Sequence, residues 1–229
     1  MNILAFDTST EACAVGVLAG NKFHTRFELT PRRHTDCVLP WSDELLQQAG
    51  ISKTKLHVIA VGIGPGAFTG VRLAVSLAQG MALALNIPII PVSTLACVAQ
   101  SQQHEGPILV LMDARMGECY VGFYQKKNGI VHALAPEQLL LPENISLPFG
   151  GEWLGVGSGF SSYAERLSGE MLTQMYSIDS SALPQPDALL QIAARAFEAG
   201  LAQAPDKIEP SYLRDKVALT IKERENKSP

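Results

Sequence analysis

Several polar residues that could handle phosphate follow the first apolar run of the sequence. Asp7, Thr8 and Ser9 end the run that begins at Asn2, and Asp113 ends a similar run in the second half of the chain. In strand-end turns, hydroxyls and backbone N–H groups bind anions, and a carboxylate binds the counter-cation. The alternative is a structural turn in which the aspartate side chain accepts hydrogen bonds from nearby backbone N–H groups. We favour the structural turn and keep a vestigial phosphate site as the second interpretation.

A glycine-rich segment, Gly62–Arg72 (GIGPGAFTGVR), is another candidate for phosphate binding. Glycines let a backbone approach another group closely, and the N-terminus of a following helix can bind an anion. The segment contains no lysine, however, and it matches neither GxxxxGK[ST] nor GxGxxG. We therefore predict a tight link from a strand to a helix capped by Thr69, with Gly64 and Gly66 as weak phosphate-site candidates.

Metal ligands and nucleophiles follow no familiar catalytic pattern. None of the five histidines belongs to an HxxxH or HExxH pair; the residue four positions after His34 is Val38. The four cysteines form no CxxC pair, which favours buried free thiols in a reducing compartment. We expect no catalytic residue, no metal ligand and no cofactor bound by this chain alone.

The elements that position these residues alternate in type over the first hundred residues. Apolar runs predict strands, and apolar residues at steps of three and four predict helices. The predicted order is β-β-β-α-β-α-β-α, with strands Asn2–Asp7, Ala12–Leu18, Phe23–Leu29, Val58–Gly62 and Pro88–Val92, and helices Thr35–Ala49, Gly70–Asn86 and Thr94–Gln103. This α/β order is typical of a ribonuclease-H-like lobe with a mixed sheet and crossover helices, the repeating unit of the actin, sugar-kinase and heat-shock-ATPase superfamily.

The second half of the chain repeats the start of the first. The stretch ILAFDTSTEACAVGV can be set against LVLMDARMGECYVGF without a gap, so that Asp7 meets Asp113. We therefore predict an N-terminal lobe over residues 1–106 and a C-terminal lobe over residues 107–210, with a cleft between the two aspartates. The segment 211–225 is a candidate addition to the N-terminal lobe.

Composition and charge narrow the classes of function. The chain has 229 residues, of which 47% are hydrophobic and 17% charged, and its net charge is −4. It is too hydrophobic for a disordered chain, and it lacks the basicity of a protein that binds nucleic acid on its own. No run approaches the roughly 20 apolar residues of a membrane helix, and the N-terminus has no basic leader. We expect a cytoplasmic protein without a membrane segment, in which a partner makes most of any contact with RNA.

The helix predicted at 70–86 is apolar on nearly every side. Ala74, Ala78 and Ala82 recur at a spacing of four, so one face is small enough for another helix to approach closely. Either the home lobe buries the whole helix, or a second subunit covers part of it. The second alternative predicts a partner interface on this helix and on the preceding one. The candidate interface residues are Val38, Trp41, Leu45, Arg72, Val75, Gln79 and Ala82.

Several motifs together resemble the TsaB family, also called YeaZ, over essentially the whole chain. They are ILAFDTSTEACAVGV, GIGPGAFTGVRLAVSLAQGMAL, PVSTLACVAQ, MDARMGECYVGFY and EPSYLRDKVA. The resemblance implies a bacterial, non-catalytic subunit of the machinery that makes threonylcarbamoyladenosine at position 37 of tRNAs. It implies heterodimerisation with a catalytic paralogue of the same fold, TsaD, through the first two helices. It also implies an ATPase, TsaE, as a further partner.

The resemblance also bears on catalysis. The catalytic paralogue holds its metal through an HxxxH pair, of which this sequence keeps only His34. We therefore expect a scaffold that stabilises the paralogue, contacts tRNA indirectly and forms a homodimer when the paralogue is absent. Binding of ATP and Mg²⁺ within the complex is left open. Two rivals remain: a glycoprotease-like, metal-dependent peptidase or ATP-using phosphotransferase acting in the interlobe cleft, and a free-standing regulatory dimer.

Overall fold

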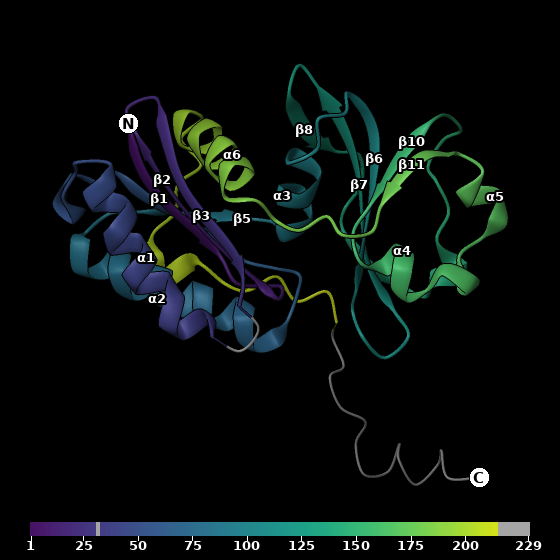
Figure 1. Cartoon of the computed structure of the whole chain (residues 1–229), viewed down its shortest axis with the longest axis horizontal. Coiled ribbons are helices and arrows are strands. Elements are labelled where there is room, and N and C mark those ends of the chain that lie inside the picture. The colour runs from purple at the N-terminus through teal and green to yellow at the C-terminus, as the bar shows by residue number, and fades with distance from the viewer. Residues whose placement is uncertain (31–32, 215–229) are drawn as a thin grey trace, which may run out of the picture.

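The first lobe is organised around a central strand that is apolar on both faces. The computed structural model describes residues 1–30 and 33–214, and its first five strands form one mixed sheet (Figure 1). β1 (Asn2–Asp7) pairs antiparallel with β2 (Ala12–Ala19) and parallel with β4 (Val58–Gly62). β3 (Lys22–Leu29) and β5 (Ile89–Val92) complete the order β3-β2-β1-β4-β5. The predicted ribonuclease-H-like lobe is confirmed, and each strand boundary lies within about one residue of its prediction.

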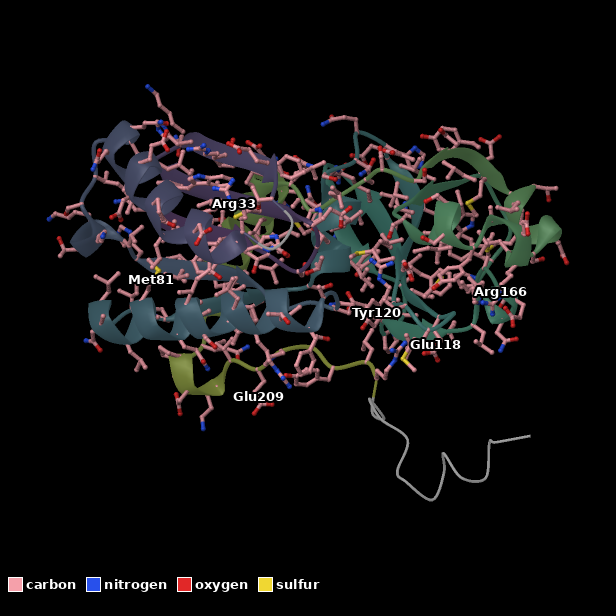
Figure 2. The ribbon with its side chains drawn as sticks, turned by 60° about the horizontal axis from the view of Figure 1, so that its bottom comes forward. Arg33, Met81, Glu118, Tyr120, Arg166 and Glu209 are labelled. Atoms are coloured by element: carbon pink, nitrogen blue, oxygen red, sulfur yellow. The ribbon has the colours of Figure 1, made fainter. Side chains whose placement is uncertain are left out.

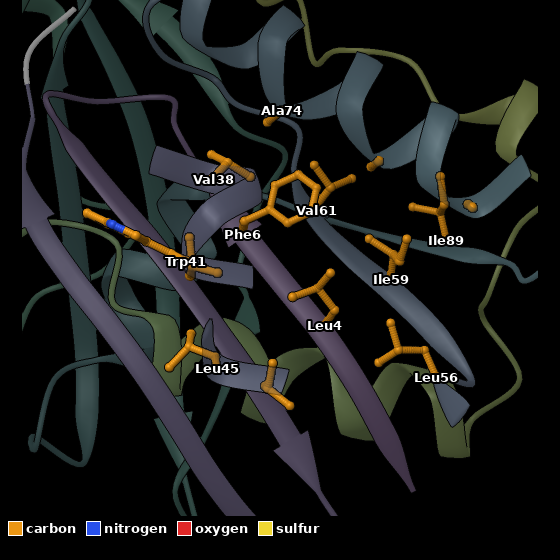
Figure 3. Close-up of a cluster of buried hydrophobic side chains, with 14 of the residues drawn as sticks. Leu4, Phe6, Val38, Trp41, Leu45, Leu56, Ile59, Val61, Ala74 and Ile89 are labelled. Atoms are coloured by element: carbon orange, nitrogen blue, oxygen red, sulfur yellow. The ribbon is translucent and has the colours of Figure 1, made fainter. Parts of the chain in front are cut away.

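Two long helices cover one face of this sheet. α1 (His34–Gln48) and α2 (Phe68–Leu85) enclose a hydrophobic core with Leu4 and Phe6 of β1 (Figure 3). Successive side chains of a strand point to opposite faces, so Ile3 and the other odd-numbered apolar residues of β1 point away from these helices. Each face of β1 therefore needs its own cover of helices.

α2 carries no charged residue other than Arg72. Its N-cap residue is Ala67, so the predicted cap at Thr69 is wrong, because Thr69 already lies in the first turn. By length and composition alone α2 could cross a membrane, with a mean hydropathy of 1.4 over 18 residues. In this fold it lies on the sheet. The residues that it turns into the lobe are Gly70, Val71, Ala74, Val75, Ala78 and Ala82.

A helix from late in the sequence covers the other face of the first sheet. α6 (Pro186–Glu198) packs its Leu189 into one core with Ile3 and Ala5 of β1. The second sheet in turn is covered by a helix from the first half of the chain, since α3 (Thr94–Gln100) follows β5 and packs against the second sheet. α6 covers the first sheet, although its residues fall within the range predicted for the C-terminal lobe. The division of the chain after residue 106 stays a prediction.

The second sheet repeats the topology of the first. Its order is β11-β10-β6-β7-β8, so β6, β7, β8, β10 and β11 take the places of β1 to β5, and β9 pairs with β7. The long helices are not repeated, since α4 (Gly159–Ser162) and α5 (Gly169–Leu172) have four residues each. The strands are β6 (Gly106–Asp113), β7 (Cys119–Lys127), β8 (Ile130–Ala133), β9 (Gln138–Leu140), β10 (Trp153–Val156) and β11 (Met175–Asp179). Short 3₁₀ turns lie at Lys53–Lys55, Pro142–Asn144, Ala164–Arg166 and Pro205–Lys207.

The two strand-end turns differ in length by one residue. Asp7 lies opposite Ala14 in the first lobe, and Asp113 lies opposite Cys119 in the second. A gapless comparison of the two halves would place Asp113 opposite Tyr120. The predicted gapless match is therefore wrong by one residue at the turn, although the shared strand order agrees with a duplicated lobe.

Candidate functional site

The two strand-end turns meet at a cavity between the lobes. The cavity measures about 950 Å³ and is lined by the β1–β2 turn, the start of α2, the β6–β7 turn and residues 211–214. Asp7 and Gly64 are buried and do not line it. The predicted phosphate-site candidates that the fold does bring together there are Thr8, Ser9, Gly66 and Asp113.

Asp7 is fully buried, and its carboxylate is used within the first lobe. One carboxylate oxygen accepts hydrogen bonds from the backbone N–H (2.7 Å) and the hydroxyl of Ser9, and the other accepts one from the Thr94 hydroxyl (2.9 Å). Loss of solvation raises the pKa of Asp7, and the hydrogen bonds from Ser9 and Thr94 oppose that rise. Asp7 therefore caps its own turn and ties β1 to the start of α3.

The glycine-rich segment packs directly against this turn. A Cβ atom added at Gly62 would lie 2.0 Å from the Asp7 carboxylate, and one at Gly70 would lie 2.0 Å from the Thr8 carbonyl oxygen. A Cβ at Gly66 would lie 2.4 Å from the carbonyl oxygen of the same turn's serine. The Thr8 hydroxyl donates to the Gly70 carbonyl at 2.7 Å. These glycines are needed for the close packing of the segment on β1, which is the tight structural link that the sequence favours.

Asp113 is also held by its own lobe. One oxygen accepts hydrogen bonds from the Arg115 N–H (2.7 Å) and the Tyr163 hydroxyl (2.6 Å), and the other lies 3.0 Å from the Arg115 guanidinium. Loss of solvation, together with the Asp113 carboxylate, raises the pKa of Tyr163 to about 12. The second aspartate therefore also caps its turn. Sequence reasoning missed Thr94 and Tyr163, because no local pattern reports a partner that is dozens of residues away.

The cavity does not fit the site for Mg²⁺ and nucleotide phosphates that the superfamily fold implies. Among the described residues, no lysine lines it, and its only acids are Glu11 and the internally bonded Asp113. No three His, Cys, Asp or Glu side chains within residues 1–30 and 33–214 come together as metal ligands. His34 lines the cavity, but Val38 is buried in the first core.

The predicted partner interface needs a correction. Five of its seven residues are buried in the core of the first lobe: Val38, Trp41, Leu45, Val75 and Ala82. A buried side chain cannot meet a docking partner, so these five assignments are wrong. Gln79 is half-buried and donates to the Pro205 and Ile208 carbonyl oxygens, both at 3.0 Å. Arg72 alone among the seven is exposed.

Other residues of the same two helices carry the exposed surface. Leu83 is 66% exposed, Phe68 52% and Leu39 43%. On α2 the exposed residues include a row from Phe68 to Leu83 at steps of four and three, which is the helical period on the side away from the sheet, and Thr69 and Ala84 are exposed beside it. We call this surface the docking face. It consists of Leu39, Phe68, Arg72, Ser76, Gly80 and Leu83.

A C-terminal strap, residues 203–214, runs along α2 and then reaches the second lobe (Figure 2). The Ser211 N–H donates to the Ile63 carbonyl at 2.8 Å, next to the glycine-rich segment. Arg214 donates to the Glu118 carboxylate at 2.5 Å and to the Ala114 carbonyl at 3.2 Å, both in the β6–β7 turn. Of the predicted addition 211–225, residues 211–214 thus contact both lobes, and the remainder lies outside the described residues.

The sequence matches known proteins over nearly its whole length. Residues 18–222 match a family model described as "TsaD: tRNA N6-adenosine threonylcarbamoyltransferase". The chain is 39% identical over 227 residues to the tRNA threonylcarbamoyladenosine biosynthesis protein TsaB of Escherichia coli (strain K12), which covers 95% of this chain and 96% of that protein. The TsaB of Haemophilus influenzae is 33% identical over 235 residues, at 95% of each chain.

Solved structures show the same similarity. The structure described as YeaZ from Pseudomonas aeruginosa superposes with a TM-score of 0.87 at 38% sequence identity. The match covers 93% of this chain and 99% of the other. The relative therefore shares the fold over nearly the whole chain.

Proposed function

The chain belongs to the TsaB (YeaZ) family, and from this premise we propose that it is the non-catalytic subunit that holds a TsaD-like catalytic paralogue in tRNA threonylcarbamoyladenosine biosynthesis. The paralogue docks on α1 and α2. A TsaE-like ATPase joins the pair, tRNA is contacted through the paralogue, and the complex works in the cytoplasm. The chain alone binds no cofactor, and any ATP and Mg²⁺ are bound within the complex.

The burial and internal hydrogen bonding of the polar residues after β1 support a non-catalytic subunit. The side-chain hydrogen bonds of the β1–β2 turn all go to groups of the first lobe or of α3, and they involve Asp7, Thr8 and Ser9. Catalytic acids and bases need access to a substrate, which a fully buried carboxylate lacks. The same observation weighs against a peptidase or a phosphotransferase in the interlobe cavity.

The observation that carries the proposal is the docking face on α1 and α2. Six of the 18 residues of α2 are buried, although the helix is apolar along its length. Large apolar side chains exposed on neighbouring helices, here Leu39, Phe68 and Leu83, are typical of a protein–protein interface. A paralogue with the same topology has two equivalent helices to place against it, and a second copy of this chain has the same two. We therefore propose a homodimer through this face when the paralogue is absent.

A charged substitution on the docking face tests this proposal. Leu83→Glu places a carboxylate where the partner must exclude water, so we expect the dissociation constant for the TsaD-like paralogue to rise about 30-fold or more. Leu201→Glu is the matched control, because Leu201 is 62% exposed but follows α6, on the opposite face of the sheet. Co-purification with the paralogue measures docking, and reconstituted tRNA modification with and without this chain measures the function.

Three outcomes would contradict the proposal. Binding by Leu83→Glu that equals that of the wild type would remove the docking face from the interface. Hydrolysis or phosphoryl transfer catalysed by the purified chain alone would make it an enzyme. Normal tRNA modification after deletion of the gene would instead favour the free-standing regulatory dimer.

A further inference from the structure

Arg72 carries the single charge of α2, and most of its guanidinium has no partner within residues 1–30 and 33–214. Its Nε donates to the Tyr212 hydroxyl at 2.8 Å, and its two terminal nitrogens make no hydrogen bond or ion pair in the described part of the chain. A guanidinium presents five N–H donors in a planar fork, so four of them stay available here. The carbon at the centre of the fork lies over an aromatic ring on the exposed side of the helix.

Two aromatic rings fix the orientation of this guanidinium. Its central carbon lies 3.4 Å from the centroid of the Phe68 ring, one turn earlier on α2, and 5.5 Å from that of Tyr212 on the C-terminal strap. Both rings are about half exposed, so they contact the guanidinium at the surface of the lobe. A side chain that is already stacked loses less conformational freedom when it binds, and this favours affinity.

We propose that Arg72 binds a carboxylate of the TsaD-like paralogue when that protein docks on the docking face, and that Tyr212 is the positioning residue for the guanidinium. This inference rests on the function proposed above and names one contact within it. The planar fork of an arginine matches the two oxygens of a carboxylate. Arginine and aromatic residues are also the types that carry much of the binding energy in protein interfaces.

The surroundings of Arg72 favour a protein carboxylate over a phosphate of RNA. The neighbouring helix α1 contains Asp36, Asp43 and Glu44 and no lysine or arginine. Nucleic-acid binding depends on several cations that neutralise successive phosphates, and α2 supplies one. Arg72 is the one charged residue among the six of the docking face, and a single cation suits one anionic side chain of a protein partner.

Tyr212 makes the strap part of this contact. The residue before it is anchored to the Ile63 carbonyl, and Arg214 is anchored to the β6–β7 turn of the second lobe. The Tyr212 hydroxyl is therefore held between two fixed points when it accepts the hydrogen bond from Arg72 Nε. Tyr212→Phe removes the acceptor and keeps the ring, so it separates the positioning of the guanidinium from the stacking.

The test is the dissociation constant between the full-length chain and the TsaD-like paralogue of the same organism, measured by calorimetry at low and at physiological salt. We expect Arg72→Gln to weaken binding about 10-fold or more. Arg72→Lys should fall in between, because it keeps the charge without the fork. Tyr212→Phe should weaken binding about 2- to 5-fold. The control Arg195→Gln, an exposed residue of α6, should bind like the wild type.

Salt dependence and stability distinguish a carboxylate contact from a structural role. The loss caused by Arg72→Gln should be larger at low salt, because screening weakens the pair that the variant lacks. All variants should keep the wild-type unfolding temperature. A dissociation constant for Arg72→Gln within about 2-fold of the wild type overturns this inference and leaves the proposed function standing.

Two further results would overturn the inference in other ways. If Arg72→Gln bound the paralogue normally but the reconstituted complex bound tRNA more weakly, the guanidinium would serve a phosphate. If the wild-type chain itself failed to bind the paralogue, the proposed function would fail, and this contact would fail with it.

Discussion

The two lobes share a strand order but differ in what covers the sheet. In the first lobe, the connections after β3 and β4 form helices of 15 and 18 residues. In the second lobe, the equivalent connections contain 3₁₀ turns and two four-residue helices. Within residues 1–30 and 33–214, it is therefore the first lobe that presents long helical surface that another protein of the same fold could match. The strands define the fold of each lobe, and the connections define which lobe meets a partner.

The two lobes are not independent, because each sheet has one face covered by a helix from the other half of the chain, α6 on the first sheet and α3 on the second. Leu189→Ala on α6 should lower the free energy of unfolding by about 2–5 kcal/mol, since Leu189 is fully buried against the first sheet. The two tryptophans report each lobe separately, Trp41 in the first and Trp153 in the second. Urea unfolding followed by each fluorescence signal should show one shared, lowered midpoint.

Single-tryptophan variants make that measurement unambiguous. Trp41→Phe leaves the signal of the second lobe, and Trp153→Phe leaves that of the first. Leu201→Ala, at an exposed leucine beyond the same helix, is the control for the substitution. A shift confined to the Trp41 signal would show that the lobes unfold independently.

Two glycines, one in each lobe, test the difference in packing between the lobes with a smaller expected effect. Gly70→Ala should lower the free energy of unfolding by about 1–3 kcal/mol, because its Cβ would lie 2.0 Å from the backbone oxygen of Thr8. Gly169→Ala is the matched control in the second lobe, where nothing lies within 4 Å of the added carbon. Thermal unfolding of both variants measures the difference. Equal stabilities would mean that the close packing on β1 has no energetic weight.

Gly80 should behave in the opposite way to Gly70, although both lie on α2. A Cβ at Gly80 meets no atom within 4 Å, so Gly80→Ala should raise the free energy of unfolding by about 0.5–1 kcal/mol. The same substitution adds a methyl group to the docking face and should weaken binding of the paralogue. Chemical denaturation and calorimetry on one preparation check both effects. A stabilised variant with unchanged docking would place Gly80 outside the contact.

The pH dependence of stability tests the burial of Asp7. Its pKa is raised in the folded chain, so the stability that it contributes is complete below the usual value of 3.8 and is lost as the pH rises through the folded pKa. We therefore expect the wild type to lose stability relative to Asp7→Asn as the pH rises above that value. Urea unfolding over a pH series measures this, with the exposed Asp187→Asn as the control for the loss of one carboxylate. Parallel pH profiles for the wild type and Asp7→Asn would contradict it.

The secondary structure was easiest to predict where the spacing of apolar residues fits one kind of element. The strands of the first lobe were predictable, because apolar runs bounded by turn residues fit few other elements. The start of α2 was harder to predict, because Thr69 is a residue type that often caps helices, whereas the helix already begins at Phe68. The capping role of Asp7 was predictable as one of two interpretations, since an aspartate in a strand-end turn suits either.

The interface residues were harder to predict for a physical reason. A helix that is apolar on all sides, such as α2, gives no contrast from which to read the side that meets the sheet. Val75 and Ala82 therefore looked equivalent to Leu83, although two are buried and one is exposed. The cluster of Phe68, Arg72 and Tyr212 joins positions 140 residues apart, which no local pattern contains.

The late position of α6 also has a consequence for a chain that is still being synthesised. β5 ends at Val92, whereas the helix that covers that side of the sheet begins at Pro186. At usual elongation rates, translation of the intervening segment takes roughly 5–20 s. Throughout that interval the side of the nascent sheet with Ile3 and Ala5 is bare, so this protein is most exposed to aggregation and to chaperones before it leaves the ribosome.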